Sequence, residues 1–314
     1  MERISIYLGS KCNANCQYCH RTEEPEVEDC SAIISLIQRH SPKRINFFGG
    51  EPLVYMKQIK EIMAAAPDAQ VKITTNGILL PKYIDFIKEH DITLAISYDG
   101  GGDNDLRNIN IPEVDLSSLT RVGISTTVYH GNTDFNALEK SLKELSKKLN
   151  HRLTLYPHIM HVTSDDNKKF RLTKEDYDSI AAQWIERTRL IVESYEKYGL
   201  FKKEYTGMLF LFKTRHELAP GVTSCVDSKN LKVDMLGRRW DCLYIRDKEW
   251  TPSYTFPEDY QCSSCKVFSY CGGACTKSIE HSLECYYYKK LYTWWQRYYP
   301  VHKQAIDTLM ERLS

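Results

Sequence analysis

The sequence predicts an α/β fold in which a partial (β/α)6 TIM-like barrel is followed by a small cysteine-rich domain and a C-terminal helix. Short apolar runs alternate with helical patterns about six times over residues 4–197. Strands that are apolar throughout are typical of a parallel sheet whose faces are covered by helices. Six units are fewer than the eight that close a barrel, so we expect an open one.

Each expected strand is followed by a turn and then, in most cases, by a helical pattern. The strand patterns cover residues 4–8, 45–48, 71–77, 92–102, 121–129 and 153–162. The helical patterns cover residues 31–39, 54–66, 81–90, 134–148 and 174–197. The strand patterns are mostly continuous runs of apolar residues, and several of them end at glycine. In the helical patterns, apolar residues recur at helical spacing.

Distinctive loops lie at the C-terminal ends of the first four strand patterns, at residues 9–20, 49–53, 75–77 and 97–102. Ligands of such barrels bind at the C-terminal ends of the strands. We therefore expect the functional site among these four loops.

Composition excludes several classes of protein. The length of 314 residues allows about two domains. Lys and Arg number 42 against 41 Asp and Glu, which excludes a globally basic nucleic-acid coat and an acidic tail. We find no apolar run of about 18 residues and no signal-peptide core, so we expect no membrane association and a cytoplasmic location.

The eleven cysteines are unusual for such a chain. Disulfides are kept reduced in the cytoplasm, and cysteine groups there more often bind metals. Four cysteines lie within residues 12–30 and seven within 225–285. This distribution indicates two separate metal regions.

Cys12, Cys16 and Cys19 have the spacing C-x3-C-x2-C. Three thiolates on one loop can hold three irons of a 4Fe–4S cluster and leave the fourth iron open, as catalysis at a metal requires. A zinc site that includes His20 and a disulfide are the alternatives.

The segment CNANCQYC resembles the signature loop of the radical SAM superfamily. Tyr18 matches an aromatic residue of that loop, and Gly49, Gly50 and Glu51 resemble the family's glycine-glycine-glutamate strand end. The resemblance implies that S-adenosylmethionine (SAM) chelates the open iron and is cleaved by one electron to a 5′-deoxyadenosyl radical. It also implies that Tyr18 packs by the adenine and that the strand end binds the methionine amino group. An ordinary turn is the alternative for that strand end.

Five more positions resemble SAM contacts of the family. Thr75, Asn76 and Ser97 would lie near the ribose and the carboxylate. Arg107 would bind the SAM carboxylate, which a planar guanidinium suits. Turn chemistry or a surface charge is the alternative for these four, and Tyr156 could face the adenine or be a core residue.

The later cysteines, together with Gly237, form the pattern C-x11-G-x4-C followed by C-x2-C-x5-C-x3-C and a last cysteine. This resembles the SPASM domain, a C-terminal extension of many radical SAM enzymes, and implies two auxiliary 4Fe–4S clusters. The implied ligands of the outer cluster are Cys262, Cys265, Cys271 and Cys285. Those of the inner cluster are Cys225, Cys242 and Cys275.

Three details of the second region stay open. No cysteine shortly precedes Cys225, so the inner cluster has an open iron or a ligand such as His216 or Glu217. A zinc ribbon over residues 262–285 is the alternative to the outer cluster. Cys30 fits neither pattern, and we expect it to be a buried core thiol.

The resemblance covers residues 4–285 and sets the expected domains. They are a radical SAM partial barrel (1–200), a bridging segment (201–224), a SPASM domain (225–285) and an aromatic C-terminal helix (286–314). The implied cofactors are SAM and three 4Fe–4S clusters, one that binds SAM and two auxiliary ones. The implied electron donor is a protein such as flavodoxin or ferredoxin.

The resemblance also favours one class of reaction. Most SPASM relatives modify peptides or proteins, so we expect crosslinking or oxidation of a side chain by an oxidoreductase, or an isomerisation. Sulfatase maturases carry an aspartate base where this chain has Leu243, so we do not expect formylglycine formation.

The first strand begins at residue 4, so leader binding would need another protein or a short motif, unless the substrate is not a peptide. Asp99 is a candidate acid–base, with turn chemistry as the alternative.

The tail contains eight aromatic residues within 286–299. Four share one helical stripe: Tyr288, Tyr292, Trp295 and Tyr299. Packing of this helix is one interpretation. Stacking on bases, with help from Lys289, Lys290 and Arg297, is the other interpretation. It keeps a nucleobase, nucleoside or other small molecule as the alternative substrate.

Two other classes of protein fit the sequence less well. An electron-transfer protein would not need the Gly-Gly-Glu strand end, and a zinc-ribbon module would not need the first cysteine loop.

Overall fold

The computed structural model describes residues 1–19, 21, 23–101, 105–161, 165–201, 230–240, 242, 261–271, 275, 278 and 281–313. The chain divides into two compact units. Unit 1 comprises Met1–Thr126, Lys140–Leu153 and Cys225–Ser253. Unit 2 comprises Thr127–Glu139, Thr154–Ser224 and Tyr254–Ser314.

The described strands form one sheet, in the order β6-β5-β4-β3-β2-β1-β7. Their bounds are β1 Arg3–Tyr7, β2 Arg44–Phe48, β3 Gln70–Thr75, β4 Thr93–Ser97, β5 Val122–Val128, β6 Thr154–Ile159 and β7 Asn230–Asp234. Every pair from β5 to β7 along this order is parallel. The strands bury apolar side chains such as Ile4, Phe47 and Ile73 completely. The expected parallel α/β sheet is confirmed.

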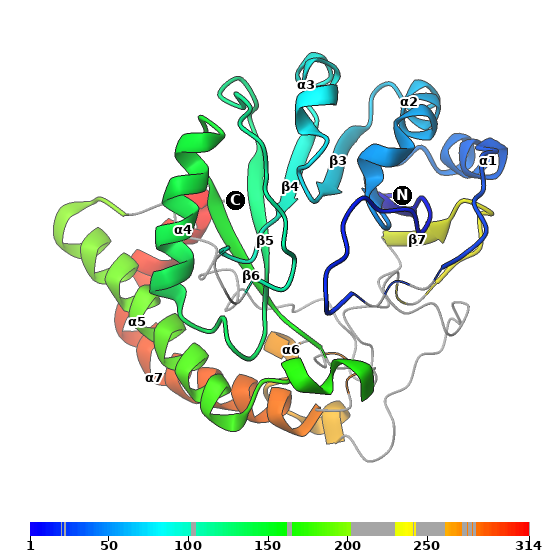
Figure 1. The fold of residues 1–314 in the computed structure, drawn as a ribbon. Coiled ribbons are helices and arrows are strands. Elements are labelled where there is room, and N and C mark those ends of the chain that lie inside the picture. The colour runs from blue at the N-terminus through cyan, green and yellow to red at the C-terminus, as the bar shows by residue number, and fades with distance from the viewer. Residues whose placement is uncertain are drawn as a thin grey trace. The chain divides into compact units, whose positions relative to one another are not determined.

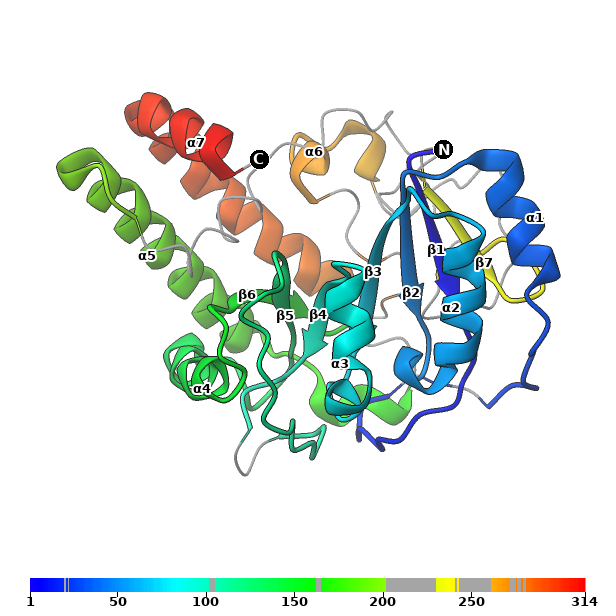
Figure 2. The same cartoon turned by 90° about the horizontal axis from the view of Figure 1, so that it is seen from above.

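Helices follow the strands as the sequence predicts. Their bounds are α1 Ser31–His40, α2 Met56–Ala64, α3 Leu80–Glu89, α4 Phe135–Lys148, α5 Lys174–Tyr198, α6 Phe268–Cys271 and α7 His281–Leu313. Figures 1 and 2 show α1, α2 and α3 on the same side of strands β1 to β4. Each of these helices buries an apolar stripe, for example Ile33 with Ile37 and Ile59 with Ile62.

Strand β7 was not among the six predicted strands. It pairs in parallel with β1, with Ile4 opposite Leu231. Asp234 ends the strand, because its carboxylate accepts hydrogen bonds from the backbone and side chain of Arg238 and from the Trp240 indole. Gly237 takes φ 76° in the turn that follows. The sequence NLKVD is short and polar at alternate positions, and only its pairing with β1 reveals it as a strand of the barrel sheet.

In unit 2, α5 and α7 run side by side (Figure 1). Helix α5 begins at a capping box between Thr173 and Asp176 and ends at Gly199, which takes φ 66°. Tyr177 of α5 and Tyr287 of α7 are both buried, with ring centroids 5.5 Å apart. The contact between these helices therefore includes a buried aromatic pair.

The aromatic residues of α7 support the packing interpretation of the tail. None of the eight within 286–299 is in the exposed class, and Trp295 is 4% exposed. The ring centroids of Tyr292 and Tyr270 lie 4.8 Å apart. Lys290, one of the cations considered for base binding, pairs with Asp178 of α5. Within the described ranges, no helix has the length and hydropathy that a bilayer crossing needs.

Candidate functional site

The candidate site lies in unit 1, where the loops after β1 to β4 begin at neighbouring positions. In the sheet register Tyr7 is opposite Phe48 and Thr75 is opposite Ile96. Cys12, Cys16 and Cys19 belong to the loop after β1, Glu51 to the loop after β2, Asn76 to the loop after β3 and Asp99 to the loop after β4. The structure therefore groups these loops at one edge of the sheet, as the topology predicts.

Gly49 and Gly50 allow the cysteine loop to lie against the end of β2. The Gly50 N–H donates to the Gly9 carbonyl at 2.9 Å, and the Glu51 N–H donates to the Lys11 carbonyl at 2.8 Å. A Cβ atom on Gly50 would lie 2.2 Å from the Lys11 carbonyl oxygen, and one on Gly49 would lie 2.8 Å from that of Gly9. The backbone that approaches these glycines closely is that of the cysteine loop itself.

Glu51 is 1% exposed and accepts three hydrogen bonds. Its Oε1 accepts from the Leu53 N–H at 3.0 Å and the Thr75 hydroxyl at 2.7 Å, and its Oε2 accepts from the Asn76 N–H at 2.7 Å. Burial raises the pKa of Glu51, although these three donors favour the ionised form. Thr75 and Asn76 thus hold Glu51, and the roles of all three toward SAM stay predictions.

Two side chains direct N–H groups at the cysteine loop. Asn76 Nδ2 lies 3.9 Å from Cys12 Sγ and 2.8 Å from Asn13 Oδ1. Arg107 Nη1 lies 3.9 Å from Cys16 Sγ. N–H donors of this kind stabilise thiolates, which are the form of cysteine that binds metals.

The three thiols of the loop are close enough to influence one another. Burial raises the pKa of the Cys16 thiol, and the neighbouring Cys19 and Cys12 thiols act in the same direction, whereas Arg107 lowers it. The Cys19 N–H donates to the Cys16 carbonyl at 3.1 Å, which tightens the loop. Three cysteines on one loop, with side-chain N–H groups 3.9 Å from two of the sulfurs, suit the thiolate ligands of an iron–sulfur cluster. Among the residues that the structure describes, no three His, Cys, Asp or Glu side chains are placed to hold a single metal ion.

Asp99 and Tyr18 surround Arg107. Arg107 Nε donates to Asp99 Oδ2 at 2.9 Å, and the Tyr18 hydroxyl donates to the same oxygen. The guanidinium carbon lies 5.4 Å from the centroid of the Tyr18 ring. The Asp99 side chain is fully buried. Asp99 is therefore the counter-ion of Arg107 in the structure. The sequence predicted Asp99 as a candidate acid–base and did not predict this ion pair.

The structure gives less information on the two remaining predicted SAM contacts, Ser97 and Tyr156. Ser97 ends β4 opposite Ser125, and it is partly exposed. Tyr156 lies in β6, but its side chain is outside the described residues. Their roles toward SAM stay predictions.

Four cysteines of unit 2 line a small cavity. Its lining comprises Cys262, Cys265, Val267, Phe268, Cys271, His281, Cys285 and Tyr288. Burial raises the pKa of Cys262, and the proximity of Cys271, Cys265 and Cys285 adds to this. These are the four cysteines that the SPASM resemblance gives to the outer cluster.

The set given to the inner cluster is only partly described. Cys225 is outside the described residues, as are His216, Glu217 and Leu243. Cys242 belongs to unit 1 and Cys275 to unit 2. The inner cluster therefore stays a prediction.

Two residues of unit 2 were not found by sequence reasoning. The buried Glu284 accepts from the Cys275 N–H at 3.2 Å, and His161 Nδ1 lies 2.9 Å from its other oxygen. Burial opposes ionisation of Glu284, but His161 and the other donors lower its pKa. Glu284 directly precedes Cys285, so its position next to a predicted ligand was the available signal. Cys30 is fully buried, which raises its pKa to about 11 and confirms the expected core thiol.

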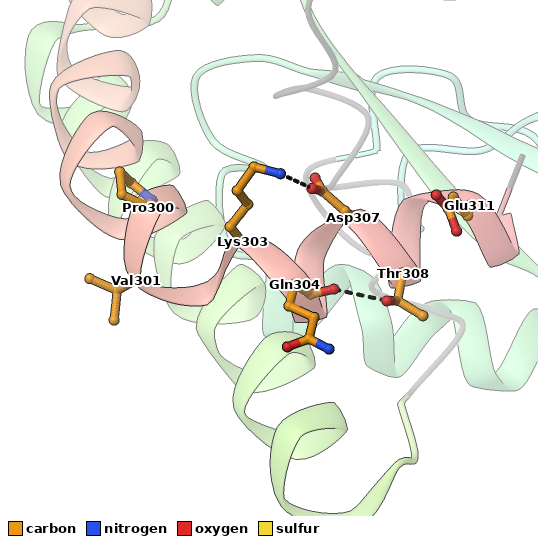
Figure 3. Close-up of a pocket in the computed structure, with 7 residues that line it drawn as sticks. All are labelled: Pro300, Val301, Lys303, Gln304, Asp307, Thr308 and Glu311. Atoms are coloured by element: carbon orange, nitrogen blue, oxygen red, sulfur yellow. Dashed lines mark hydrogen bonds and ion pairs between the residues drawn. The ribbon is translucent and has the colours of Figure 1, made fainter.

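A surface hollow on the last turns of α7 has a different character (Figure 3). Its lining comprises Pro300, Val301, Lys303, Gln304, Asp307, Thr308 and Glu311. Lys303 pairs with Asp307 along the helix at 2.7 Å. The Thr308 hydroxyl donates to the Gln304 carbonyl at 2.8 Å, so these polar contacts lie within the helix itself. The cysteine loop of unit 1 is the better candidate site.

Replacing Gly50 with Ala should prevent the cysteine loop from docking, because the new Cβ would overlap the Lys11 carbonyl. After anaerobic reconstitution we expect the variant to lack about four irons per chain, one 4Fe–4S cluster, by iron and sulfide analysis. Gly199→Ala is the control, since nothing lies within 4 Å of its Cβ position. Its positive φ should lower stability by about 1 kcal/mol without changing the iron content. Equal iron loss in both variants would contradict the docking argument.

Comparisons with known proteins agree with this site. Residues 6–116 match the sequence model of the Radical SAM superfamily. A probable GTP 3′,8-cyclase of Methanocella arvoryzae is 36% identical over 93 residues, which are 27% of this chain and 30% of that protein. The GTP 3′,8-cyclase of Chlorobaculum tepidum is 33% identical over 98 residues, which are 28% of this chain and 30% of that protein. These matches therefore span less than a third of the relatives' length.

The similarity in fold to solved structures covers nearly the whole chain. The structure of native anSMEcpe with bound AdoMet has a TM-score of 0.67 and covers 98% of this chain and 100% of that one, at 17% identity. The same enzyme with AdoMet and the Cp18Cys peptide also has a TM-score of 0.67, covers 98% and 99% of the two chains, and is 16% identical. At these identities the likeness shows the fold. The family match covers the cysteine loop and the strand ends that surround it, so residues 6–116 of this chain are a radical SAM domain, the type of domain found in a class of enzymes.

Proposed function

We propose that this enzyme uses SAM and a 4Fe–4S cluster on Cys12, Cys16 and Cys19 to abstract a hydrogen atom from a peptide or protein side chain. When bound, the cluster and SAM would supply reductive cleavage to a 5′-deoxyadenosyl radical. The observation that carries the proposal is a loop with three cysteines at the C-terminal ends of the strands, in which side-chain N–H groups lie 3.9 Å from the sulfurs of Cys12 and Cys16.

The surrounding residues would position SAM. Gly49 and Gly50 hold the cysteine loop against β2, which brings the partly exposed Cys12 and Cys16 thiols to the edge of the sheet. The backbone of this strand end, with Glu51, is proposed to receive the methionine ammonium. Arg107 is proposed to bind the SAM carboxylate, and Tyr18, Thr75, Asn76, Ser97 and Tyr156 to line the nucleoside side. In this proposal Asp99 holds Arg107 and does not transfer protons.

Two findings support different substrate classes. A peptide is bound in a structure of anSMEcpe, whose fold this chain shares, and this supports a peptide or protein substrate. The sequence similarity to GTP 3′,8-cyclases supports the alternative, a nucleotide or nucleoside. We favour the peptide, because the packed aromatic side chains of α7 and the pairing of Lys290 with Asp178 weaken the case for a base-stacking tail.

The second cysteine region is proposed to hold two auxiliary clusters. Cys262, Cys265, Cys271 and Cys285, which line one cavity, would complete the outer cluster. Cys225, Cys242 and Cys275 would hold the inner one. Such clusters could accept an electron from a substrate radical, which would make the net reaction oxidative. A flavodoxin or ferredoxin is proposed to reduce the SAM-binding cluster.

Replacing Cys12, Cys16 and Cys19 together with Ala should abolish 5′-deoxyadenosine formation from SAM, measured by chromatography under a strong reductant. The variant should also lack about four irons per chain, because one cluster loses its ligands. Cys30→Ala is the matched control, since this buried thiol lies outside the loop. It should retain both the iron and the activity. Persistent SAM cleavage in the triple variant would refute the assignment.

The auxiliary clusters predict an iron content of about twelve per chain in the reconstituted enzyme. Replacing Cys262, Cys265, Cys271 and Cys285 with Ala should lower it by about four, with the SAM-binding cluster still present by electron paramagnetic resonance (EPR). Anaerobic crystallography should then show four cysteines on the outer cluster of the parent enzyme and three on the inner. A further cysteine ligand on the inner cluster, such as Cys30, would contradict the unequal ligation.

The substrate class is tested by hydrogen transfer. With SAM and reductant, a deuterated peptide substrate should yield deuterated 5′-deoxyadenosine, whereas GTP and free nucleosides should not. A sulfatase-derived Cys or Ser peptide should give no formylglycine by mass spectrometry, because Leu243 replaces the aspartate base. Tight, salt-sensitive binding of DNA or RNA that is lost on changing Lys289, Lys290 and Arg297 would overturn the peptide assignment.

A further inference from the structure

We propose that two buried carboxylates, Asp99 and Glu51, act as positioning residues that set the reduction potential of the cluster on the first cysteine loop. Each would do so by holding an N–H donor against a cysteine sulfur. Arg107 is the donor to Cys16 and Asn76 is the donor to Cys12. The inference rests on the cluster proposed above and deepens it, because it assigns electron-transfer tuning to residues outside the cysteine motif.

The Arg107 side chain is fixed by three contacts in different directions. Its Nε donates to Asp99 at 2.9 Å, its Nη1 lies 3.9 Å from Cys16 Sγ, and its guanidinium carbon lies 5.4 Å from the centroid of the Tyr18 ring. Only 14% of the side chain is exposed. The loops themselves are joined by a hydrogen bond from the Gln17 N–H to the Leu106 carbonyl at 2.9 Å. The guanidinium is therefore held beside the sulfur by both the side chains and the backbone.

Asn76 is fixed in a comparable way. Its backbone N–H donates to Glu51 at 2.7 Å, and its Oδ1 accepts from the Ile78 N–H at 3.0 Å. The opposite end of the amide, Nδ2, then lies 2.8 Å from Asn13 Oδ1 and 3.9 Å from Cys12 Sγ. Because Oδ1 is occupied by a backbone donor, the orientation with the NH2 group toward the loop is favoured.

N–H donors to cysteine sulfur raise the reduction potential of an iron–sulfur cluster, because they stabilise the more negative, reduced state. A guanidinium adds a permanent positive charge to this effect. The effect is larger where water is excluded, since the low dielectric strengthens each interaction. The partly buried Cys16 beside the buried Asp99–Arg107 pair meets that condition.

The role of Asp99 can be separated from a simple effect of its charge, because the two have opposite signs. A negative charge near the cluster lowers its potential, so neutralising Asp99 would raise the potential if charge were its only contribution. If Asp99 instead holds Arg107, neutralisation releases the guanidinium from Cys16, and the potential falls. The direction of the shift therefore identifies the mechanism.

The experiment is an EPR-monitored redox titration of the reconstituted full-length enzyme. SAM is added first to the parent, to identify the part of the signal that it alters. The potential of that cluster is then measured without SAM, so that any role of Arg107 in SAM binding does not enter. Arg107→Gln should shift the oxidised-to-reduced ratio at a fixed solution potential by at least about tenfold toward oxidised, which is about 59 mV for a one-electron couple.

Further variants separate the contributions. Arg107→Lys keeps the charge but not the planar fork, so it should shift the potential in the same direction by less. Asn76→Ala removes the second donor without a change of charge and should also lower the potential. Asp99→Asn should lower it too, but should have little further lowering effect in the Arg107→Gln background, where no guanidinium remains to be released.

Asp105→Asn is the matched control for Asp99→Asn. Asp105 accepts a hydrogen bond from the backbone N–H of Arg107 at 2.9 Å, whereas Asp99 accepts one from its guanidinium. By the charge argument above, Asp105→Asn should leave the potential unchanged or raise it slightly, whereas Asp99→Asn should lower it. Circular dichroism and iron content confirm that each variant is folded and loaded, and Arg107→Lys serves if Arg107→Gln fails either test.

The outcomes distinguish this inference from the proposed function. A rise of the potential in Asp99→Asn, or parent-like potentials in loaded Arg107 and Asn76 variants, would overturn the inference while SAM cleavage by the parent left the function intact. Absence of a SAM-responsive cluster from the parent itself would instead overturn the proposed function.

Discussion

The buried carboxylate of Glu51 is the constraint on which the rest of the site depends. Its oxygens accept from Leu53, Thr75 and Asn76, and its own N–H donates to Lys11. One residue thus joins the loops that follow β1, β2 and β3. A buried charge is costly unless it is hydrogen-bonded. The three donors and the carboxylate therefore fix each other's positions. The cysteine loop gains a defined shape without regular secondary structure of its own.

The charges of the site also explain what it can attract. Three cysteines, which would be thiolates when bound to iron, lie at this edge of the sheet with the carboxylates of Glu51 and Asp99, and Arg107 lies beside Asp99 and Cys16. Iron offsets part of this negative charge when a cluster is bound. A ligand with both an ammonium and a sulfonium group complements the remainder, and its carboxylate matches the arginine. SAM has all three groups, which supports its place in the proposed function.

Much of the fold could be predicted, because its signals are local. The apolar strands and the glycines after them mark β1 to β4, and the spacing of Cys12, Cys16 and Cys19 marks the loop. Strand β7 could not be predicted, since its identity depends on pairing with β1 more than 200 positions away in the chain. Helix α7 was recognised as aromatic, but only its contacts with α5 distinguish packing from base stacking.

The candidate site shows the same division between local and distant information. The cysteines and the Gly-Gly-Glu strand end could be read as motifs. Asp99 could be read only as a loop acid, because its partners Tyr18 and Arg107 come from two other segments. Glu284 was missed for a similar reason, since its partner His161 lies 123 residues earlier. A residue whose role is to hold another residue leaves no pattern in the sequence around it.

Glu51 and Glu284 together suggest why buried carboxylates accompany the cysteine segments. The described residues of the first cysteine loop form no helix or strand, so backbone N–H groups in and around it need other acceptors. A carboxylate has two oxygens and can accept from several such groups at once. Glu51 accepts the Asn76 N–H beside the first cysteine loop, and Glu284 accepts the Cys275 N–H in unit 2. Both acids lie next to residues with metal-binding roles in our proposal, where loss of the carboxylate would leave buried donors unpaired and the sulfur positions undefined.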